Sequence, residues 1–345
     1  MFPDQQKFND MTQYLYKYRF WILYALFSLT IIFSVQQEWI NAYIQLVMMY
    51  IGINIILSSS LNIVNGYMGE FSCGHAGFVA VGAYVTSVLN VWLFVSDRVF
   101  GAPVVSENYA LFLFPVTLLI GGIAAAFVGL LVAIPSFNTR GDYLAIITLA
   151  VNYIVKSAIE NIQIIGGARG FMGMRKVVNA MHDLWDIPWM MIFTLVFTGL
   201  TVWIIWRFVS STYGKGIIAV REDEIAAEIM SVNTQRMKMT AFMLSSGLAG
   251  VAGGLFAHVL GYINPGSFTI MKSTEVMVMV YLGGMGSLSG SVLSAILFTI
   301  LLELLRPLQV IKWVVIPLML ILLMMFRPEG IMGDREIKDI FRKKS

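Results

Sequence analysis

Apolar segments separated by short polar or glycine-rich stretches make up most of the chain. Their lengths are close to the roughly 20 residues that a helix needs to cross the hydrocarbon core of a bilayer. This pattern predicts an all-α fold, a polytopic integral membrane helical bundle with about ten transmembrane helices. The segments lie near 20–35, 40–64, 74–95, 110–134, 143–160, 187–209, 241–262, 268–284, 286–305 and 310–326.

Basic residues flank both ends of this series and set its expected orientation. Lys7, Lys17 and Arg19 precede the first segment, and a basic tail follows the last. Because positive residues in short flanks stay in the cytoplasm, both termini are expected there, with an even number of crossings. The basic loop 161–186 then lies outside, against the same rule. The expected parts are a cytoplasmic N-terminal segment at 1–19, a transmembrane domain at 20–326 with a cytoplasmic loop at 210–240, and a basic cytoplasmic tail at 327–345.

The composition fits a membrane protein and argues against several other classes. Of 345 residues, 58% are hydrophobic and 12% are charged, about half the charged fraction of a soluble domain. A net charge of +3 is too small to indicate a nucleic-acid partner. The single cysteine excludes an intramolecular disulfide, and three histidines form no pattern typical of a zinc site.

The longest polar stretch between apolar segments is 213–238, YGKGIIAVREDEIAAEIMSVNTQRMK. Helical spacing over 221–231 places Ile225 and Ile229 on one face, with Ala226 and Met230 beside them. So short a helix cannot bury this face against itself, and needs lipid headgroups, the rest of the protein or a partner. The alternative is a solvated helix that only joins two spans. The candidate coupling residues are Arg221, Glu222, Asp223, Glu224, Ala226, Ala227 and Glu228.

Two glycine- and serine-rich breaks interrupt the apolar pattern in a similar way. Each follows an apolar segment and precedes a span of small residues, which suggests an internal repeat of the kind found in transporters, although so short a match can also arise by chance. A broken helix exposes backbone groups, which are tolerated only against protein or a watery cavity. We therefore expect both breaks to shape a translocation pathway, unless they are simple turns. The candidate residues are Gly66, Gly69, Ser72 and His75 in the first break and Gly283, Gly284 and Gly286 in the second.

The chain carries no motif for hydrolytic chemistry. Walker A, HExxH and GxSxG patterns are absent from the sequence, so we expect no enzymatic activity and no cofactor bound by this chain. His258 is the titratable residue deepest in a span, and a neutral histidine bonded to a neighbouring helix is favoured over a proton relay. The spacing of Gly250 and Gly254 permits close helix approach, within the bundle or at a dimer seam.

With these residues in view, the sequence resembles the permease subunits of branched-chain amino acid ABC importers, of the LivM type. The resemblance extends from about Gly52 to Gly333 and is carried by five stretches in the family's order. These are LNIVNGYMGEFSCGHAGFVAVGAY (61–84), TRGDYLAIITLA (139–150), AVREDEIAAEIMSVN (219–233), AFMLSSGLAGVAGGLFAHVLGYINPGSF (241–268) and STEVMVMVYLGGMGSLSG (273–290).

The resemblance implies a set of partners and a location. These are a paired homologous permease, two cytoplasmic subunits that bind the ATP, an extracytoplasmic solute-binding protein and the lipid of a bacterial cytoplasmic (inner) membrane. It also implies that the loop around 213–238 docks on the ATPase through the candidate coupling residues. Three departures from the family pattern affect these expectations: Ser231 replaces a usual glycine, Gly166–Gly170 reads GGARG instead of GGPNG, and Cys73 replaces a usual leucine.

Two other functions stay open at this point. A permease for urea or short-chain amides would have a similar sequence and a more polar pathway. A facilitator or channel without an ATPase would have no docking partner for the 213–238 stretch. A membrane enzyme would need an intramembrane catalytic constellation, which the sequence does not contain.

Overall fold

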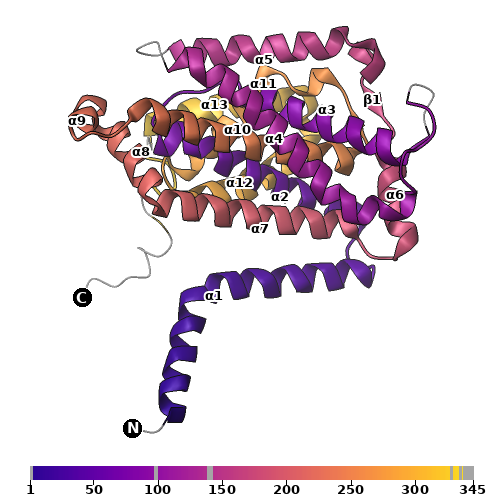
Figure 1. Ribbon diagram of the computed structural model, residues 1–345, viewed down its shortest axis with the longest axis horizontal. Helices are drawn as coiled ribbons and strands as arrows, with labels where there is room; N and C mark the ends of the chain where they lie inside the picture. The colour runs from indigo at the N-terminus through magenta and orange to yellow at the C-terminus, as the bar shows by residue number, and fades with distance from the viewer. Residues whose placement is uncertain (1–2, 97–99, 138–142, 327–328, 334–335, 337–345) are drawn as a thin grey trace. The chain divides into compact units, whose positions relative to one another are not determined.

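The computed structural model describes residues 3–96, 100–137, 143–326, 329–333 and 336. The chain divides into two compact units, 1–45 and 46–345, and each is described by itself. The first contains α1 (Pro3–Gln36), which begins well before the apolar segment predicted at 20–35. The described part of the predicted 1–19 segment is therefore helical (Figure 1).

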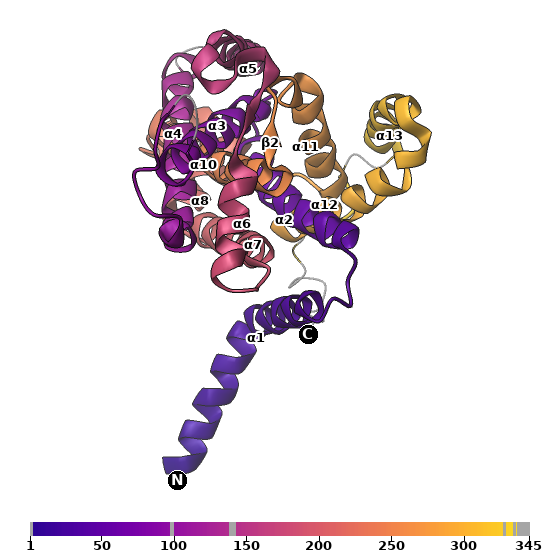
Figure 2. The same ribbon diagram turned by 90° about the vertical axis from the view of Figure 1, so that its right-hand side faces the viewer.

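Six helices are long and apolar enough to cross a membrane, counting only the described residues. They lie alongside one another in the bundle, with α5 and α7 on opposite sides (Figures 1 and 2). This arrangement confirms the predicted all-α, polytopic bundle. The helices are α2 (Ala42–Asn62), α3 (His75–Phe94), α4 (Ala110–Ser136), α5 (Tyr143–Asn161), α7 (Trp189–Ser210) and α10 (Thr234–Leu260).

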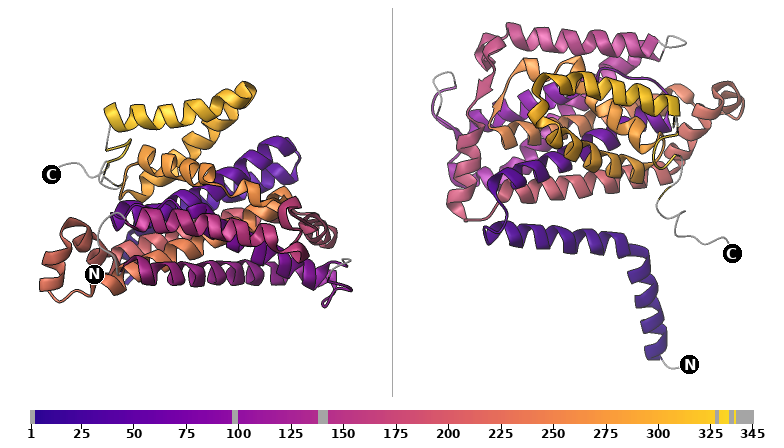
Figure 3. Two further views of the ribbon diagram at one scale, coloured as in Figure 1. Left: turned by 90° about the horizontal axis from the view of Figure 1, so that it is seen from above. Right: turned by 180° about the vertical axis from the view of Figure 1, so that it is seen from behind.

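Three shorter helices follow at the C-terminal side of the chain. They are α11 (Ile270–Gly283), α12 (Leu288–Leu304) and α13 (Lys312–Phe326). Figures 2 and 3 show α13 set apart from the group formed by α3, α4 and α10. Each of the predicted apolar segments thus contains one helix, but α11 has 14 residues and is shorter than a full crossing requires. The count of ten crossings stays a prediction.

The core is formed where α10 packs against α3 and α4. A Cβ on Gly82 of α3 would lie 2.1 Å from the Gly250 carbonyl oxygen of α10, and one on Gly250 would lie 2.4 Å from the Ala125 Cβ of α4. Helix backbones approach this closely only where the facing residues are small. The glycine-rich face of α10 is therefore buried within the bundle. Of the two alternatives given for Gly250 and Gly254, the structure shows packing within the bundle and not a dimer seam.

Contacts along these helices define their directions and hence two ends of the bundle. Gly82 meets Gly250, and Asn90 hydrogen-bonds to His258 further along both helices, so α3 and α10 run in parallel. Both helices begin at the end that carries α8 (Thr212–Glu222) and α9 (Glu224–Ile229), which we call the α9 end.

The opposite end, called the β1 end, is closed by the segment between α5 and α7. Strand β1 (Phe171–Met172) pairs antiparallel with β2 (Tyr262–Ile263), with Phe171 opposite Ile263. Next to it, α6 (Met174–Leu184) buries Met174, Val177 and Met181. One-turn 3-10 helices complete the chain's elements: Glu107–Tyr109, Gln163–Ile165, Gly167–Arg169 and Pro265–Ser267, with a longer one at Arg306–Ile311.

Candidate functional site

The polar stretch 213–238 folds as two short helices and the start of α10. The Ser211 hydroxyl caps α8 by accepting a hydrogen bond from Gly214 N at 3.3 Å. Asp223 then adopts an extended conformation, and its carboxylate accepts from Ala226 N at 3.0 Å. Aspartate is among the strongest N-cap residues, so it ends one helix and starts the next. The single helix predicted over 221–231 is thus split, with Arg221 and Glu222 on α8 and the later residues on α9.

One face of α9 is apolar and exposed. Ile225, Ile229 and Met230 are 72%, 77% and 78% exposed, whereas Ala227 is buried against the bundle. Large apolar side chains this exposed on one short helix are typical of a surface that binds a partner. The predicted face therefore exists, and no other described residue covers it; Figure 1 shows α9 projecting at one end of the bundle.

The turn after α9 has the conformation that glycine prefers. Ser231 has a φ of 62°, and Val232 N donates to Ala227 O at 3.0 Å. This is the bonding of a Schellman turn, whose left-handed position is usually glycine because a Cβ is disfavoured there. The departure from the family pattern at this position leaves the turn intact and places a serine in it.

Replacing Ser231 by glycine should stabilise the C-terminal turn of α9. Removing the Cβ relieves about 1 kcal/mol of left-handed strain, partly offset by the greater freedom of glycine in the unfolded chain. We expect slower hydrogen exchange of the α9 amides in Ser231→Gly than in wild type. Ser231→Ala keeps the Cβ and is the control. Faster exchange in the glycine variant would show that the serine side chain itself holds the turn.

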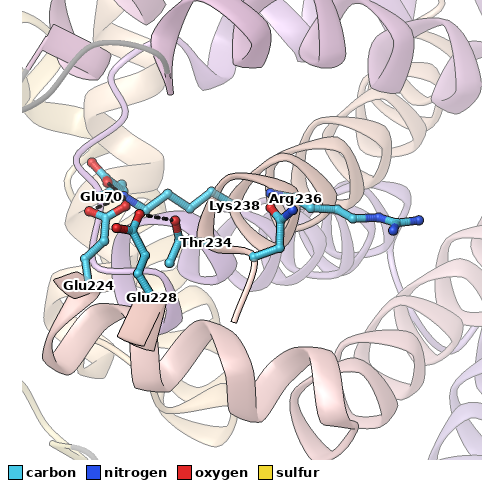
Figure 4. Close-up of polar contacts among 7 residues, drawn as sticks. Glu70, Glu224, Glu228, Thr234, Arg236 and Lys238 are labelled. Atoms are coloured by element: carbon cyan, nitrogen blue, oxygen red, sulfur yellow. Dashed lines mark hydrogen bonds and ion pairs between the residues drawn. The ribbon is translucent and has the colours of Figure 1, made fainter. Parts of the chain in front are cut away.

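Lys238 connects α10, α9 and the first break. Its ammonium lies 2.7 Å from the Glu70 carboxylate and 2.9 Å from that of Glu224, and its side chain is 10% exposed. The same ammonium lies 5.9 Å from the centre of the Phe137 ring. Figure 4 shows both carboxylates converging on Lys238, with Arg236 pointing away. A cation shielded from water and shared by two acids fixes the positions of both segments.

Glu228 of α9 is also bonded to α10. Its carboxylate accepts a hydrogen bond from the Thr234 hydroxyl at 3.0 Å (Figure 4). Helix α9 is therefore held to the beginning of α10 at two of its turns, through Glu224 and Glu228, while its apolar face stays free.

The first break begins with a widened helical turn. Met68 N donates to Ile63 O, five residues earlier, at 3.0 Å, so α2 continues as a π-helix over Ile63–Tyr67. Turns of this kind occur often at functional sites. The guanidinium of Arg221 donates to the Gly66 carbonyl at 3.1 Å, and Gly69 (φ +76°) lies under the Arg221 side chain. The coupling stretch therefore contacts the break directly.

The other predicted residues of the first break are buried. His75 is 2% exposed, and its Nε2 lies 3.0 Å from the Ser60 hydroxyl. The Ser72 amide donates to the Asn65 side-chain oxygen at 3.3 Å. These contacts shape the turn from α2 into α3, so Ser72 and His75 hold the break from inside.

The two breaks meet at Gly66 and Gly286. A Cβ on Gly66 would lie 2.4 Å from Gly286 N. Between them, Asn62 accepts a hydrogen bond from Gly286 N at 3.0 Å and donates to Ser287 O at 2.9 Å and to the Ser291 hydroxyl at 2.8 Å. Segments more than 200 residues apart in sequence are thus joined by one buried asparagine side chain.

Residues of the predicted tail return to the second break. Ile331 N and Met332 N donate to the carbonyls of Leu282 and Gly283, and Gly284 packs against Gly333. Of the predicted tail 327–345, only 329–333 and 336 are among the described residues. Residues 329–333 therefore form part of the structure around Gly283 and Gly284.

Glu336 caps the N-terminus of α12. Its carboxylate accepts from Leu288 N at 2.8 Å, from Ser289 N at 3.1 Å and from the Ser289 hydroxyl at 2.5 Å. Tyr67 of the first break donates to the same carboxylate at 3.3 Å. A carboxylate is favoured at this end of a helix by the free N–H groups and the helix dipole. One acid thus connects the tail to both breaks.

Sequence reasoning missed three residues of this site: Asn62, Lys238 and Glu336. Asn62 could have been noticed as an asparagine at the end of an apolar segment directly before the first break. Lys238 and Glu336 lie in charged stretches with nothing local to distinguish them from solvated neighbours. His258 is bonded through Nδ1 to Gly254 O and through Nε2 to Asn90 of α3, the bonded histidine expected from the sequence.

The coupling stretch and the two breaks are connected by a continuous set of polar contacts. Two contact routes lead from α9 and α8 to the breaks, one through Lys238 and Glu70 and the other through Arg221 and Gly66. Within the part of the chain that the structure describes, no group of three or more His, Cys, Asp or Glu could hold a metal ion.

Comparisons with known proteins identify similar sequences. Residues 43–326 match the family model described as "Branched-chain amino acid transport system / permease component". The chain is 33% identical over 304 residues to the high-affinity branched-chain amino acid transport system permease protein LivM of Escherichia coli strain K12, covering 81% of this chain and 68% of that protein. No solved structure gives a significant match.

The alignments with two more distant relatives span nearly the whole length of those proteins. The probable branched-chain amino acid transport permease protein LivM of Methanocaldococcus jannaschii is 22% identical over 85% of this chain and 94% of its own. The high-affinity permease protein LivH of Salmonella typhimurium is 23% identical over 83% of this chain and 92% of its own.

Proposed function

Because the chain belongs to the family of branched-chain amino acid transport permeases and resembles its LivM members, we propose that it forms half of the translocation pathway of an ATP-driven importer for these amino acids. Its partners are a homologous permease, two ATP-binding subunits and an extracytoplasmic solute-binding protein. ATP is bound by the partner subunits. The multi-pass chain lies in a bacterial cytoplasmic (inner) membrane with both termini and the α9 end in the cytoplasm.

The observation that carries this proposal is the exposed apolar face of α9, attached to the first break by the ion pairs of Lys238 with Glu224 and Glu70. Docked in a groove of an ATPase subunit, this face would follow the subunit when ATP closes the pair. Lys238 and Arg221 would pass the movement to the first break, and Asn62 would pass it to the second. The cavity between the permeases then alternates between outward-open and inward-open states.

The test of the function is ATP hydrolysis by the reconstituted complex with its binding protein, scanned across leucine, isoleucine, valine, urea and short amides. Stimulation by the branched-chain amino acids supports the proposal. Stimulation by urea alone keeps the importer and changes the solute. If no ATPase assembles with the chain, the importer proposal is wrong and an independent facilitator or channel takes its place.

Polar substitutions on the exposed face should separate docking from folding. In the double variant Ile225→Asn, Ile229→Asn, both side chains are exposed, so the chain should stay folded and inserted. Loss of two central apolar contacts costs an interface about 1–2 kcal/mol each, and we expect most of the ATPase to be lost on detergent purification. Ile164→Asn, at a residue 62% exposed at the β1 end, is the control. Full ATPase retention in the double variant would remove α9 as the docking helix.

A further inference from the structure

Helix α11 begins partway across the bundle. Its 14 residues rise roughly 21 Å, less than the roughly 30 Å hydrocarbon core, and its last residues reach the α9 end beside the second break. At its start, Phe268 packs against Tyr84 of α3 and Phe256 of α10, at ring distances of 6.3 and 6.1 Å. Tyr84 is in the middle of α3 and Phe256 is one turn before the end of α10, so α11 starts inside the bundle and short of its β1 end.

An ion pair lies in the first turns of α11. Lys272 Nζ is 3.0 Å from the Glu275 carboxylate, and the two side chains are 20% and 14% exposed. Charged groups at membrane depth are costly, and they usually face a pathway or a protein partner. Lys272 is also close to the positive end of the helix dipole, where a cation is disfavoured. The presence of this ion pair is therefore not explained by a stabilising effect on α11.

Two aromatic rings form an apolar wall beside Lys272. The Lys272 ammonium lies 5.8 Å from the centre of the Phe256 ring, and Tyr50 of α2 lies 6.0 Å from the same ring. Tyr50, Phe256, Lys272 and Glu275 are all partly exposed. Two charges of opposite sign thus lie next to an accessible apolar wall built from α2 and α10.

We propose that Lys272 and Glu275 bind the zwitterionic end of the transported amino acid within the pathway. The solute carboxylate accepts hydrogen bonds from the Lys272 ammonium, and the solute ammonium donates to Glu275. The branched side chain packs on Phe256 and Tyr50. Without solute the two groups pair with each other, which limits the cost of keeping them in the membrane. An uncharged solute such as urea has no carboxylate for Lys272 and no ammonium for Glu275.

This inference rests on the proposed function, and the experiment separates the two. Complexes carrying Lys272→Gln or Glu275→Gln are reconstituted with the binding protein, and leucine uptake and leucine-stimulated ATP hydrolysis are measured. We expect each variant to lose uptake by at least about tenfold, the usual effect of truncating one partner of a shielded charge pair. Co-purification of the ATPase subunits with each variant shows that the complex still assembles.

The control is the pair Glu303 and Arg306, which has the same i,i+3 spacing on the α12 side and is more exposed. The double variant Glu303→Gln, Arg306→Gln should transport like wild type. Leucine uptake by Lys272→Gln and Glu275→Gln within twofold of wild type would overturn the site. A wild-type complex that shows no leucine-dependent activity would instead overturn the proposed function.

A photoreactive diazirine analogue of leucine tests the site without any substitution. In the wild-type complex it should label the peptides that carry Tyr50, Phe256 or Lys272, and excess leucine should suppress the labelling while urea does not. Labelling confined to other parts of the chain, or suppressed by urea, would overturn the assignment even if the charge variants failed to assemble.

Discussion

Replacing Lys238 by methionine should abolish coupled transport while the chain still inserts into the membrane. Methionine keeps an unbranched side chain that is one atom shorter, and it leaves the Glu70 and Glu224 carboxylates facing each other without a cation. Breaking a shielded ion pair in this way costs more stability than the roughly 0–1 kcal/mol of a surface pair. It costs less than the roughly 3–5 kcal/mol of a fully buried pair. Because Glu224 is 47% exposed, we expect about 2 kcal/mol, enough to release α9 from the first break.

The measurement compares ATP hydrolysis and solute uptake in the same proteoliposomes. Hydrolysis should continue and lose its dependence on solute, and uptake should fall close to background. Arg236→Met is the matched control, because Arg236 lies on the same turn of α10 and points away from both acids (Figure 4). Solute-dependent uptake that persists in Lys238→Met would mean that Arg221 and Gly66 alone carry the coupling.

Periodicity and hydropathy were sufficient to place the helices of the bundle. Each apolar segment contains a helix because a backbone in lipid has to satisfy its own hydrogen bonds. The ends of the helices were less accurate. Helix α10 begins at Thr234, seven residues before the segment predicted at 241, since its first turns carry Arg236 and Lys238. A hydropathy criterion excludes charged residues at a helix end, because their composition is that of a loop.

The site was predicted in its parts and not in its connections. The glycines of the two breaks and the acids of α9 stand out locally, and the apolar face of α9 follows from helical spacing. That Gly66 would touch Gly286, or that Glu336 would cap α12, depends on how distant segments pack. No local pattern encodes such pairings. The start of α11 inside the bundle was hidden for the same reason, since Lys272 and Glu275 resemble residues of a span end.

The buried asparagine between the two breaks gives the second prediction. Asn62→Leu should lower the thermal stability of the complex and block transport. Leucine has a similar size but satisfies none of the three hydrogen bonds. The Ser287 carbonyl keeps a bond from Ser291 N, so the orphaned group is the Gly286 amide. Because the Gly286 amide is partly buried, its loss of a partner costs about 1 kcal/mol, and the other lost bonds add about 1 kcal/mol.

Asn54→Leu is the control for this prediction, because it makes the same change eight residues earlier on α2. Among the described residues, the Asn54 side chain donates to the Thr299 hydroxyl alone, and that hydroxyl also donates to Ala295 O of its own helix. Its loss should cost about 1 kcal/mol and leave uptake nearly normal. Thermal aggregation of the purified complex and solute uptake separate the outcomes. Equal losses in the two variants would show that any polar residue on α2 is needed for folding. A stable but inactive Asn62→Leu would show that the contact between the breaks serves the transport cycle, because packing then survives without it and movement does not.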